Sequence, residues 1–145
     1  ESGFYKGCRF FRVLPDFVAQ FGINGDPDVQ QKARQTVLED DPVLHTNAYG
    51  TLSFATSGPN TRTTQLFFNI RDSGNDFLDA QGFAPFAEVI EGIEHLSRIN
   101  DEYEEKPKQD KIQEKGQFYL DKNYPRLTYI KHVWEEEIEA ADEAS

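Results

Sequence analysis

Residues 9–22 read Arg-Phe-Phe-Arg-Val-Leu-Pro-Asp-Phe-Val-Ala-Gln-Phe-Gly, and this stretch decides the expected fold. Side chains alternate between the two faces of a β-strand, so a strand over residues 9–13 would place Phe10 and Arg12 on the same face. A Pro-Asp pair then interrupts the run, which is typical of a tight turn. Residues 17–21 form a second predicted strand, and the stretch therefore indicates two strands around a corner.

The second predicted strand carries polar and aromatic side chains in alternation. Phe17 and Phe21 would share one face, while Val18 and Gln20 would share the other. Together with Arg12, these groups can grip a peptide by hydrogen bonds and apolar contact, without covalent chemistry.

A second block, residues 50–68, reads Gly-Thr-Leu-Ser-Phe-Ala-Thr-Ser-Gly-Pro-Asn-Thr-Arg-Thr-Thr-Gln-Leu-Phe-Phe. Alternation over residues 50–55 predicts a strand, and the Ser-Gly-Pro-Asn that follows predicts a turn. A further strand is expected over residues 65–70, with Gln65 and Phe67 on one face. These two side chains are therefore expected to point into the same space.

The rest of the chain adds mainly short elements to these strands. We expect further strands at residues 83–90 and 127–134, and helices at residues 28–38, 92–100 and 109–123. Many strands with few helices indicate a β-barrel or sandwich with peripheral helices. A length of 145 residues suits one domain with a substantial core.

Charge and hydropathy limit the classes of partner. The chain has 15 basic and 26 acidic residues, for a net charge of -11, and no basic cluster. We therefore expect no nucleic-acid partner. The acidic runs indicate solvated surface and a tail, with an acidic interaction tail as the alternative. No apolar run approaches the roughly eighteen residues of a membrane span, so no membrane partner is expected, and the compartment stays open.

The metal-ligating residue types are sparse. Cys8 is the single cysteine, so an internal disulfide is impossible and a zinc site is not expected. We interpret Cys8 as a small buried apolar residue, with a reactive thiol as the alternative. Asp40, Asp41 and His45 lie close together in the sequence and could be imagined as a metal cluster. They do not provide three well-spaced ligands, and we expect them in an extended surface loop. No metal and no cofactor are predicted.

Both blocks resemble the cyclophilin family of peptidyl-prolyl isomerases. The family signature Phe-x-Arg-x-x-Pro-x-Phe-x-x-Gln-x-Gly stands here as Phe10, Arg12, Pro15, Phe17, Gln20 and Gly22. The elements Gly-x-Leu-x-x-Ala, Gly-Pro-Asn-Thr and Ser/Thr-Gln-Phe/Leu-Phe follow in order within residues 50–68. Two long motifs in the right order are a strong signal, and the resemblance extends from Gly3 to about His132.

This resemblance implies a mainly β fold, a cyclophilin-like antiparallel β-barrel with peripheral helices. It divides the chain into an isomerase domain at residues 1–134 and an acidic tail at residues 135–145. The N-terminal hairpin and first helix of the family are not seen in this sequence. We therefore expect that a missing N-terminal segment of the same chain, or another segment, pairs with the predicted strand at residues 127–134.

The resemblance also implies peptidyl-prolyl cis-trans isomerase activity on proline-containing peptides and proteins. Arg12 is the candidate catalytic residue. Phe17, Phe67 and Leu78 would line an apolar proline pocket. The full set of candidate substrate-binding residues is Phe17, Val18, Gln20, Ala55, Thr56, Gln65, Phe67, Phe77 and Leu78. Within this set, Phe77 and Val18 stand where the family pocket has a tryptophan and a methionine, departures that bear on cyclosporin binding more than on isomerase chemistry.

Each assignment has a structural alternative. Phe17 and Phe67 could be ordinary core aromatics, and Arg12 could be a surface ion-pair residue. At the level of the whole chain, the alternatives are a non-catalytic cyclophilin-like module that binds proline-containing segments of a partner protein, and a small-molecule-binding barrel. Retention of Arg12 and Gln20 favours the enzyme.

Overall fold

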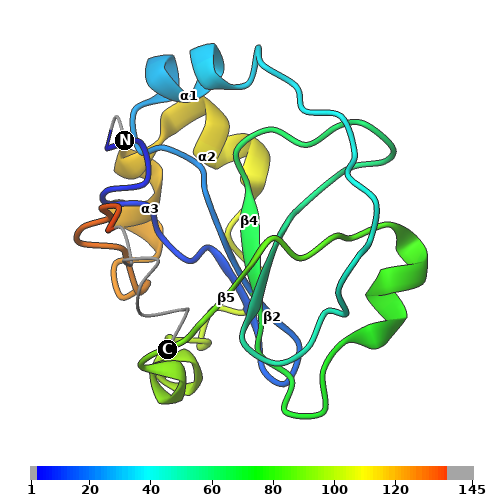
Figure 1. Ribbon diagram of the computed structural model, residues 1–145. Helices are drawn as coiled ribbons and strands as arrows, with labels where there is room; N and C mark the ends of the chain where they lie inside the picture. Colours follow the sequence, from blue (N-terminus) through cyan, green and yellow to red (C-terminus); the bar gives the residue numbers. More distant parts are fainter. Residues whose placement is uncertain (1–2, 137–145) are drawn as a thin grey trace.

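An antiparallel sheet forms the centre of the protein. The computed structural model describes residues 3–136. Its strands are β1 (Arg12–Leu14), β2 (Val18–Phe21), β3 (Thr51–Phe54), β4 (Leu66–Asn69) and β5 (Ala87–Glu88). They lie in the order β1-β2-β4-β3-β5, and Figure 1 shows the helices around this sheet. The predicted mainly β, antiparallel architecture is confirmed; beyond Glu136, the predicted acidic tail lies outside the described residues.

A tight hairpin joins β1 to β2. Its turn contains Asp16 at φ 57°, a left-handed conformation that aspartate tolerates better than most residues. The Phe17 N–H donates to the Leu14 carbonyl over 3.1 Å and closes the turn. The hairpin register then places Arg12 opposite Gln20.

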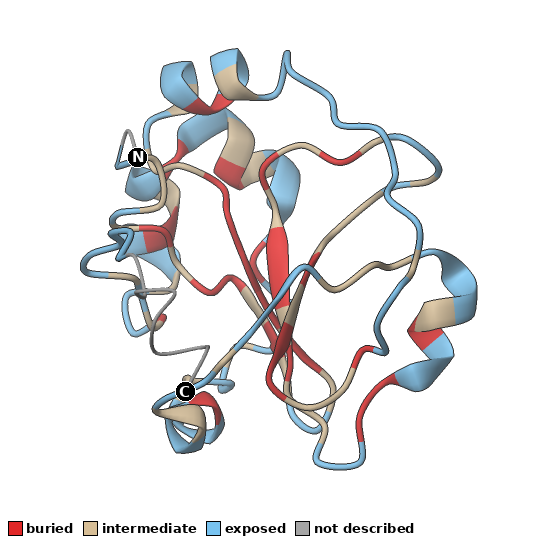
Figure 2. Ribbon diagram, in the orientation of Figure 1, coloured by how far each residue is buried: buried red, intermediate tan, exposed pale blue. Residues whose placement is uncertain are grey.

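The sheet has two different faces. One face packs on a core of five buried side chains, and Figure 2 shows how burial concentrates on the strands. These side chains are Phe10, Val13, Ala19, Phe21 and Leu66. On the other face, the register aligns Arg12 with Gln20 and Gln20 with Phe67 across three strands. Cross-strand partners share a face, so this row of residues is brought together by pairing alone.

Two side chains depart from the predicted alternation. Phe10 lies in the core with Val13 and not on the face of Arg12, because β1 begins only at Arg12. Phe17 precedes β2 and packs beside Val18, away from Phe21. The expectation that Phe10 would share a face with Arg12, and Phe17 with Phe21, was therefore wrong, since the pleat does not extend to the ends of these runs.

The helix predicted at residues 28–38 is shorter than expected. α1 spans Pro27–Ala33, with proline at its first position and the Asp26 side chain accepting a hydrogen bond from the Asp28 N–H. This is the capping chemistry that begins a helix. Beyond α1, Leu38 forms an isolated bridge with Arg62.

One 3-10 helix replaces a predicted α-helix, and another forms where no element was predicted. η1 covers Asp76–Gln81, and η2 covers Ile93–Arg98 where an α-helix was predicted at residues 92–100. The strand predicted at residues 83–90 is reduced to β5.

The helix predicted at residues 109–123 is two helices. α2 spans Gln109–Lys115 and α3 spans Gln117–Asn123, with Gly116 between them at φ 63°. A Cβ on Gly116 would lie 2.1 Å from the Gly25 carbonyl oxygen, so only glycine fits this contact. Buried Phe11, Ile23, Ile112, Leu120 and Leu127 join both helices to the domain. Figure 1 shows α2 beside α1 at one end of the sheet.

The predicted strand at residues 127–134 forms only a short pairing. The Gly7 N–H donates to the Ile130 carbonyl over 2.7 Å, and the Phe10 N–H donates to the Thr128 carbonyl over 2.8 Å. Arg9 and Tyr129 form an isolated antiparallel bridge between them. No helix within residues 3–136 is both long enough and apolar enough to cross a membrane.

Candidate functional site

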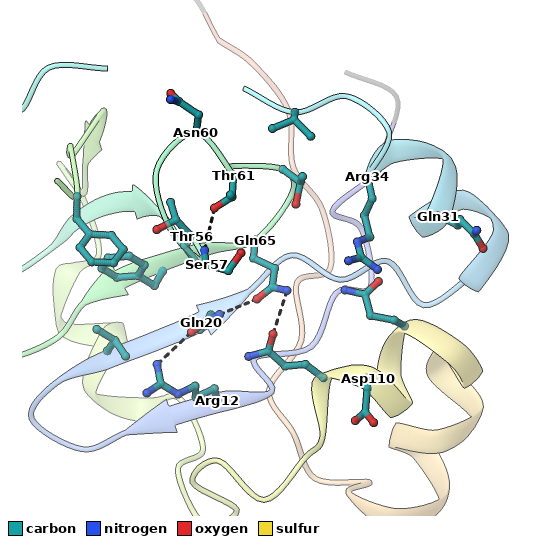
Figure 3. A pocket seen from close by; sticks show the side chains of 18 of the residues that line it. Arg12, Gln20, Gln31, Arg34, Thr56, Ser57, Asn60, Thr61, Gln65 and Asp110 are labelled. Carbon is teal, nitrogen blue, oxygen red and sulfur yellow. Dashed lines mark hydrogen bonds between the residues drawn. The ribbon is translucent and has the colours of Figure 1, made fainter. Parts of the chain in front are cut away.

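A cavity of about 1240 Å³ opens on the face of the sheet that carries Arg12, Gln20 and Phe67. Every predicted site residue except Phe77 lines it. These residues are Arg12, Phe17, Val18, Gln20, Ala55, Thr56, Gln65, Phe67 and Leu78. The volume exceeds the 300–1,000 Å³ common for small-molecule sites. Figure 3 shows Arg12, Gln20, Thr56 and Gln65 around the space, with Arg34 and Asp110 from the helical side.

One end of the cavity is apolar. Val18, Phe67 and Leu78 are buried there, and Phe17, Ala55 and Phe83 pack against them. The Phe83 ring meets the Phe67 ring edge to face, with centroids 5.6 Å apart. Phe77 does not line the cavity; its ring stacks on the Phe17 ring, with centroids 6.0 Å apart.

A buried network of polar side chains hydrogen-bonds to the backbone of this apolar end. Asn47, Asn69 and Asn75 are fully buried. The Asn75 Nδ2 donates to the Phe17 carbonyl over 2.9 Å, and the Asn47 Nδ2 donates to the Phe83 carbonyl over 2.9 Å. Two aromatic walls of the pocket are therefore anchored through their backbones.

Asp79 on η1 completes this network. Its Oδ1 accepts from the Asn47 Nδ2 over 2.7 Å and from the Asn47 backbone N–H over 2.9 Å. Burial alone would raise the pKa of Asp79, but hydrogen bonds from Thr46 and Asn47 outweigh it and lower the pKa below the usual value. The carboxylate form therefore ties η1, which carries Leu78, to the loop before β3.

The other end of the cavity is a string of polar side chains. Arg12 Nη1 donates to Gln20 Oε1 over 3.2 Å, and Arg12 Nε donates to Glu105 Oε2 over 3.1 Å. Gln20 Nε2 donates to Gln65 Oε1 over 2.6 Å, and Figure 3 draws these bonds from Arg12 to Gln65. Gln65 Nε2 donates in turn to Gln109 Oε1 over 3.1 Å. The Arg12 guanidinium is thus held by two partners at the edge of an apolar pocket.

Several lining or supporting residues were missed by sequence reasoning. Glu105 and Gln109 follow η2, and Gln31 and Arg34 belong to α1 and its end. Each of them contacts or faces residues far away in the sequence, which no local pattern predicts. Phe83 could have been suspected, because it is an aromatic residue shortly after Leu78.

Asp40 and Asp41 both form ion pairs with Arg62. Arg62 Nη2 lies 3.2 Å from Asp41 Oδ2, and Arg62 Nε lies 3.9 Å from Asp40 Oδ1. The arginine side chain is mostly buried and its guanidinium lies over the Phe54 ring. Within residues 3–136, no group of three or more His, Cys, Asp or Glu side chains could hold a metal ion.

Cys8 is buried, as predicted. Burial is the main cause that raises the pKa of its thiol to about 11, against smaller lowering effects of Arg9 and the Gly22 backbone. The thiol therefore stays protonated at neutral pH and is a poor nucleophile.

A comparison with protein families identifies the class. The family model for "Cyclophilin type peptidyl-prolyl cis-trans isomerase/CLD" matches residues 1–117. This match covers most of the chain and includes every residue that lines the cavity. The chain belongs to the cyclophilin type peptidyl-prolyl cis-trans isomerase family.

Individual relatives agree with this assignment. The chain is 39% identical over 107 residues to peptidyl-prolyl cis-trans isomerase A of Dickeya dadantii, covering 69% of this chain and 54% of that protein. It is 33% identical over 108 residues to peptidyl-prolyl cis-trans isomerase B of Escherichia coli, covering 68% and 64%. A crystal structure of a cyclophilin type peptidyl-prolyl cis-trans isomerase from Cryptosporidium parvum matches with a TM-score of 0.54 and 28% identity, over 67% of this chain and 62% of that one.

The matched region does not extend over the whole of these relatives. A peptidyl-prolyl cis-trans isomerase of Acinetobacter baylyi is 34% identical over 105 residues, which cover 68% of this chain and 54% of that protein. The chain thus spans about half the length of two of the curated relatives that it matches.

Proposed function

We propose that this chain catalyses cis-trans isomerisation of X-Pro peptide bonds, with the Arg12 guanidinium favouring the twisted amide. Resonance in the amide sets a rotational barrier of about 18–20 kcal/mol, and the uncatalysed X-Pro reaction takes tens to hundreds of seconds. No covalent bond is made or broken. A catalyst therefore has to hold the proline and stabilise the amide where its conjugation is lost.

The position of Arg12 carries this proposal. Its Nε and Nη1 are held by Glu105 and Gln20, and no protein partner of Nη2 lies within the described residues. Arginine stays protonated and offers donors in a fixed fork. In the twisted amide the prolyl nitrogen becomes pyramidal and recovers its lone pair, so a donor held beside it favours that geometry over both planar isomers.

The two ends of the cavity suit the two parts of the substrate. The proline ring is apolar and would be buried against Phe17, Phe67 and Leu78. Peptide groups next to the proline would meet the amides of Gln20 and Gln65. Ala55 and Thr56 on the opposite rim would contact the chain before the proline through main-chain groups.

The test is the isomerase activity of the Arg12→Ala variant. A short X-Pro peptide with a protease that cleaves only the trans isomer gives the rate, and NMR exchange on the same peptide checks it without protease. Removing one preorganised donor from comparable electrostatic sites costs about 10²–10³ in kcat. We expect a loss of this order. Near-wild-type turnover in folded Arg12→Ala protein contradicts the mechanism.

Arg98→Ala is the matched control, because Arg98 is exposed, does not line the cavity, and within residues 3–136 its side chain hydrogen-bonds only to the His95 ring. This variant should keep wild-type activity. Wild-type protein that binds proline-containing peptides but does not accelerate their isomerisation would instead indicate the non-catalytic binding module.

A further inference from the structure

The hydrogen bonds that hold Arg12 continue beyond the sheet to Gln109, the first residue of α2. They run from Arg12 to Gln20 over 3.2 Å, from Gln20 to Gln65 over 2.6 Å, and from Gln65 to Gln109 over 3.1 Å. Each of the three bonds has its donor on the side nearer Arg12. The string therefore has a direction.

Arginine imposes this direction, because its guanidinium has donors and no acceptor. Gln20 must turn its oxygen toward Arg12, which leaves its NH₂ group for Gln65. Gln65 must then accept with its oxygen and donate with its own NH₂ group. An acceptor beyond Gln65 satisfies this arrangement. A donor there would face the NH₂ group of Gln65 and favour the flipped amide, which conflicts with the orientations of Gln20 and Arg12.

We propose that Gln109 is a positioning residue for the peptide site: its side-chain oxygen fixes the orientation of the Gln65 amide and, through Gln20, that of the Arg12 guanidinium. The functional part of this inference rests on the proposed isomerase activity. Gln109 does not touch the reacting amide. It acts by keeping one N–H of Gln65 bound outside the site, so that the carboxamide presents a single orientation to the peptide.

The location of Gln109 is well defined by the packing of α2. Ile112, one turn further, is fully buried. The Gln117 N–H donates to the Gly25 carbonyl over 2.8 Å, and the Lys108 N–H donates to the Tyr119 hydroxyl over 3.1 Å. Both ends of α2 are therefore anchored, and the beginning of the helix is held where Gln109 can reach Gln65.

Three substitutions of Gln109 test the direction of the string. Gln109→Glu keeps an acceptor, Gln109→Met keeps the length without a polar group, and Gln109→Lys offers only donors. We expect kcat/KM within about twofold of wild type for Glu, a loss of about two- to tenfold for Met, and a loss at least as large for Lys. Wild-type kcat/KM for both Met and Lys, or equal losses for Glu and Met, would overturn the proposal.

Lys115→Met provides the control. Lys115 lies on α2 but does not line the cavity, and its replacement changes the net charge by the same amount as Gln109→Glu. It should leave kcat/KM unchanged. A double-mutant cycle then separates positioning from helix stability: in a Gln65→Met background, Gln109→Met should cause no further loss. Additive losses would show that Gln109 acts by another route.

Side-chain NMR signals provide a readout that does not depend on activity. Gln109→Met should shift the amide signals of Gln65 and Gln20 and the Nε–H signal of Arg12, while Lys115→Met should not. If Gln109→Met causes these shifts but the wild-type protein has no isomerase activity, the proposed function is refuted and the positioning role stands. Activity in wild-type protein without such shifts in Gln109→Met would refute the positioning role alone.

Discussion

Replacement of Asn69 by leucine should weaken the fold through the amide network below the apolar end of the cavity. Asn69 is fully buried, and its Nδ2 donates to Asn47 Oδ1 over 3.0 Å and to Thr51 Oγ1 over 2.8 Å. Its Oδ1 accepts from Asn75 Nδ2 over 2.9 Å. Three buried hydrogen bonds at about 0.5–1.5 kcal/mol each give about 1.5–4.5 kcal/mol.

The expected value lies in the lower half of that range. Asn47 Oδ1 still accepts from Ser53 Oγ over 2.8 Å, and Asn75 Nδ2 still donates to the Phe17 carbonyl over 2.9 Å. No partner loses its last bond, and leucine has nearly the same branched shape as asparagine. We therefore expect the free energy of unfolding to fall by about 2–3 kcal/mol.

Urea unfolding at neutral pH measures this loss, with the m-value as a check that the transition stays comparable. Asn123→Leu is the matched control, because Asn123 is exposed on α3 and should change stability by less than about 0.5 kcal/mol. A decrease below about 0.5 kcal/mol in Asn69→Leu would refute the view that these bonds stabilise the pocket.

Two further predictions concern pH. Isomerase activity should be nearly flat between about pH 6 and 9, since arginine does not titrate there and no histidine stands among the described residues that line the cavity; an inflection in the histidine range would contradict the mechanism. Stability should show an alkaline component from Cys8, whose folded pKa of about 11 lies above the ordinary 9.0. A raised folded pKa gives stability that is present below pH 9.0 and lost toward pH 11. The free energy of unfolding, measured in urea, should therefore fall more across this range in wild type than in Cys8→Ala.

The strands and the aromatic part of the site could be predicted from sequence because their determinants are local. Alternation places Gln65 and Phe67 on one face, and pairing of adjacent strands then brings Gln20 beside Phe67. The ends of the strands were less predictable. Phe10 and Phe17 lie where the pleat begins or ends, so their side chains turn to neighbours that lie outside the strand.

The polar end of the cavity could not be predicted, because it depends on contacts between distant segments. Gln109 reaches Gln65 from α2, which packs on α1, and Glu105 reaches Arg12 from the segment before α2. The break at Gly116 was also not predicted: one helix was expected over residues 109–123, whereas the positive φ of Gly116 separates two helices. A local scale of propensity does not include the close approach of another backbone.

The close contact between Gly116 and Gly25 also affects the cavity, because α2 forms part of its lining. At the junction of α2 and α3, the backbone of Gly116 rests directly on the Gly25 carbonyl group, with no side chain between them. A larger residue at position 116 would clash with this carbonyl group, so the junction of α2 and α3 would have to move away from Gly25. Asp110 and Glu114 of α2 line the cavity, so the packing of Gly116 on Gly25 also sets where these two side chains lie.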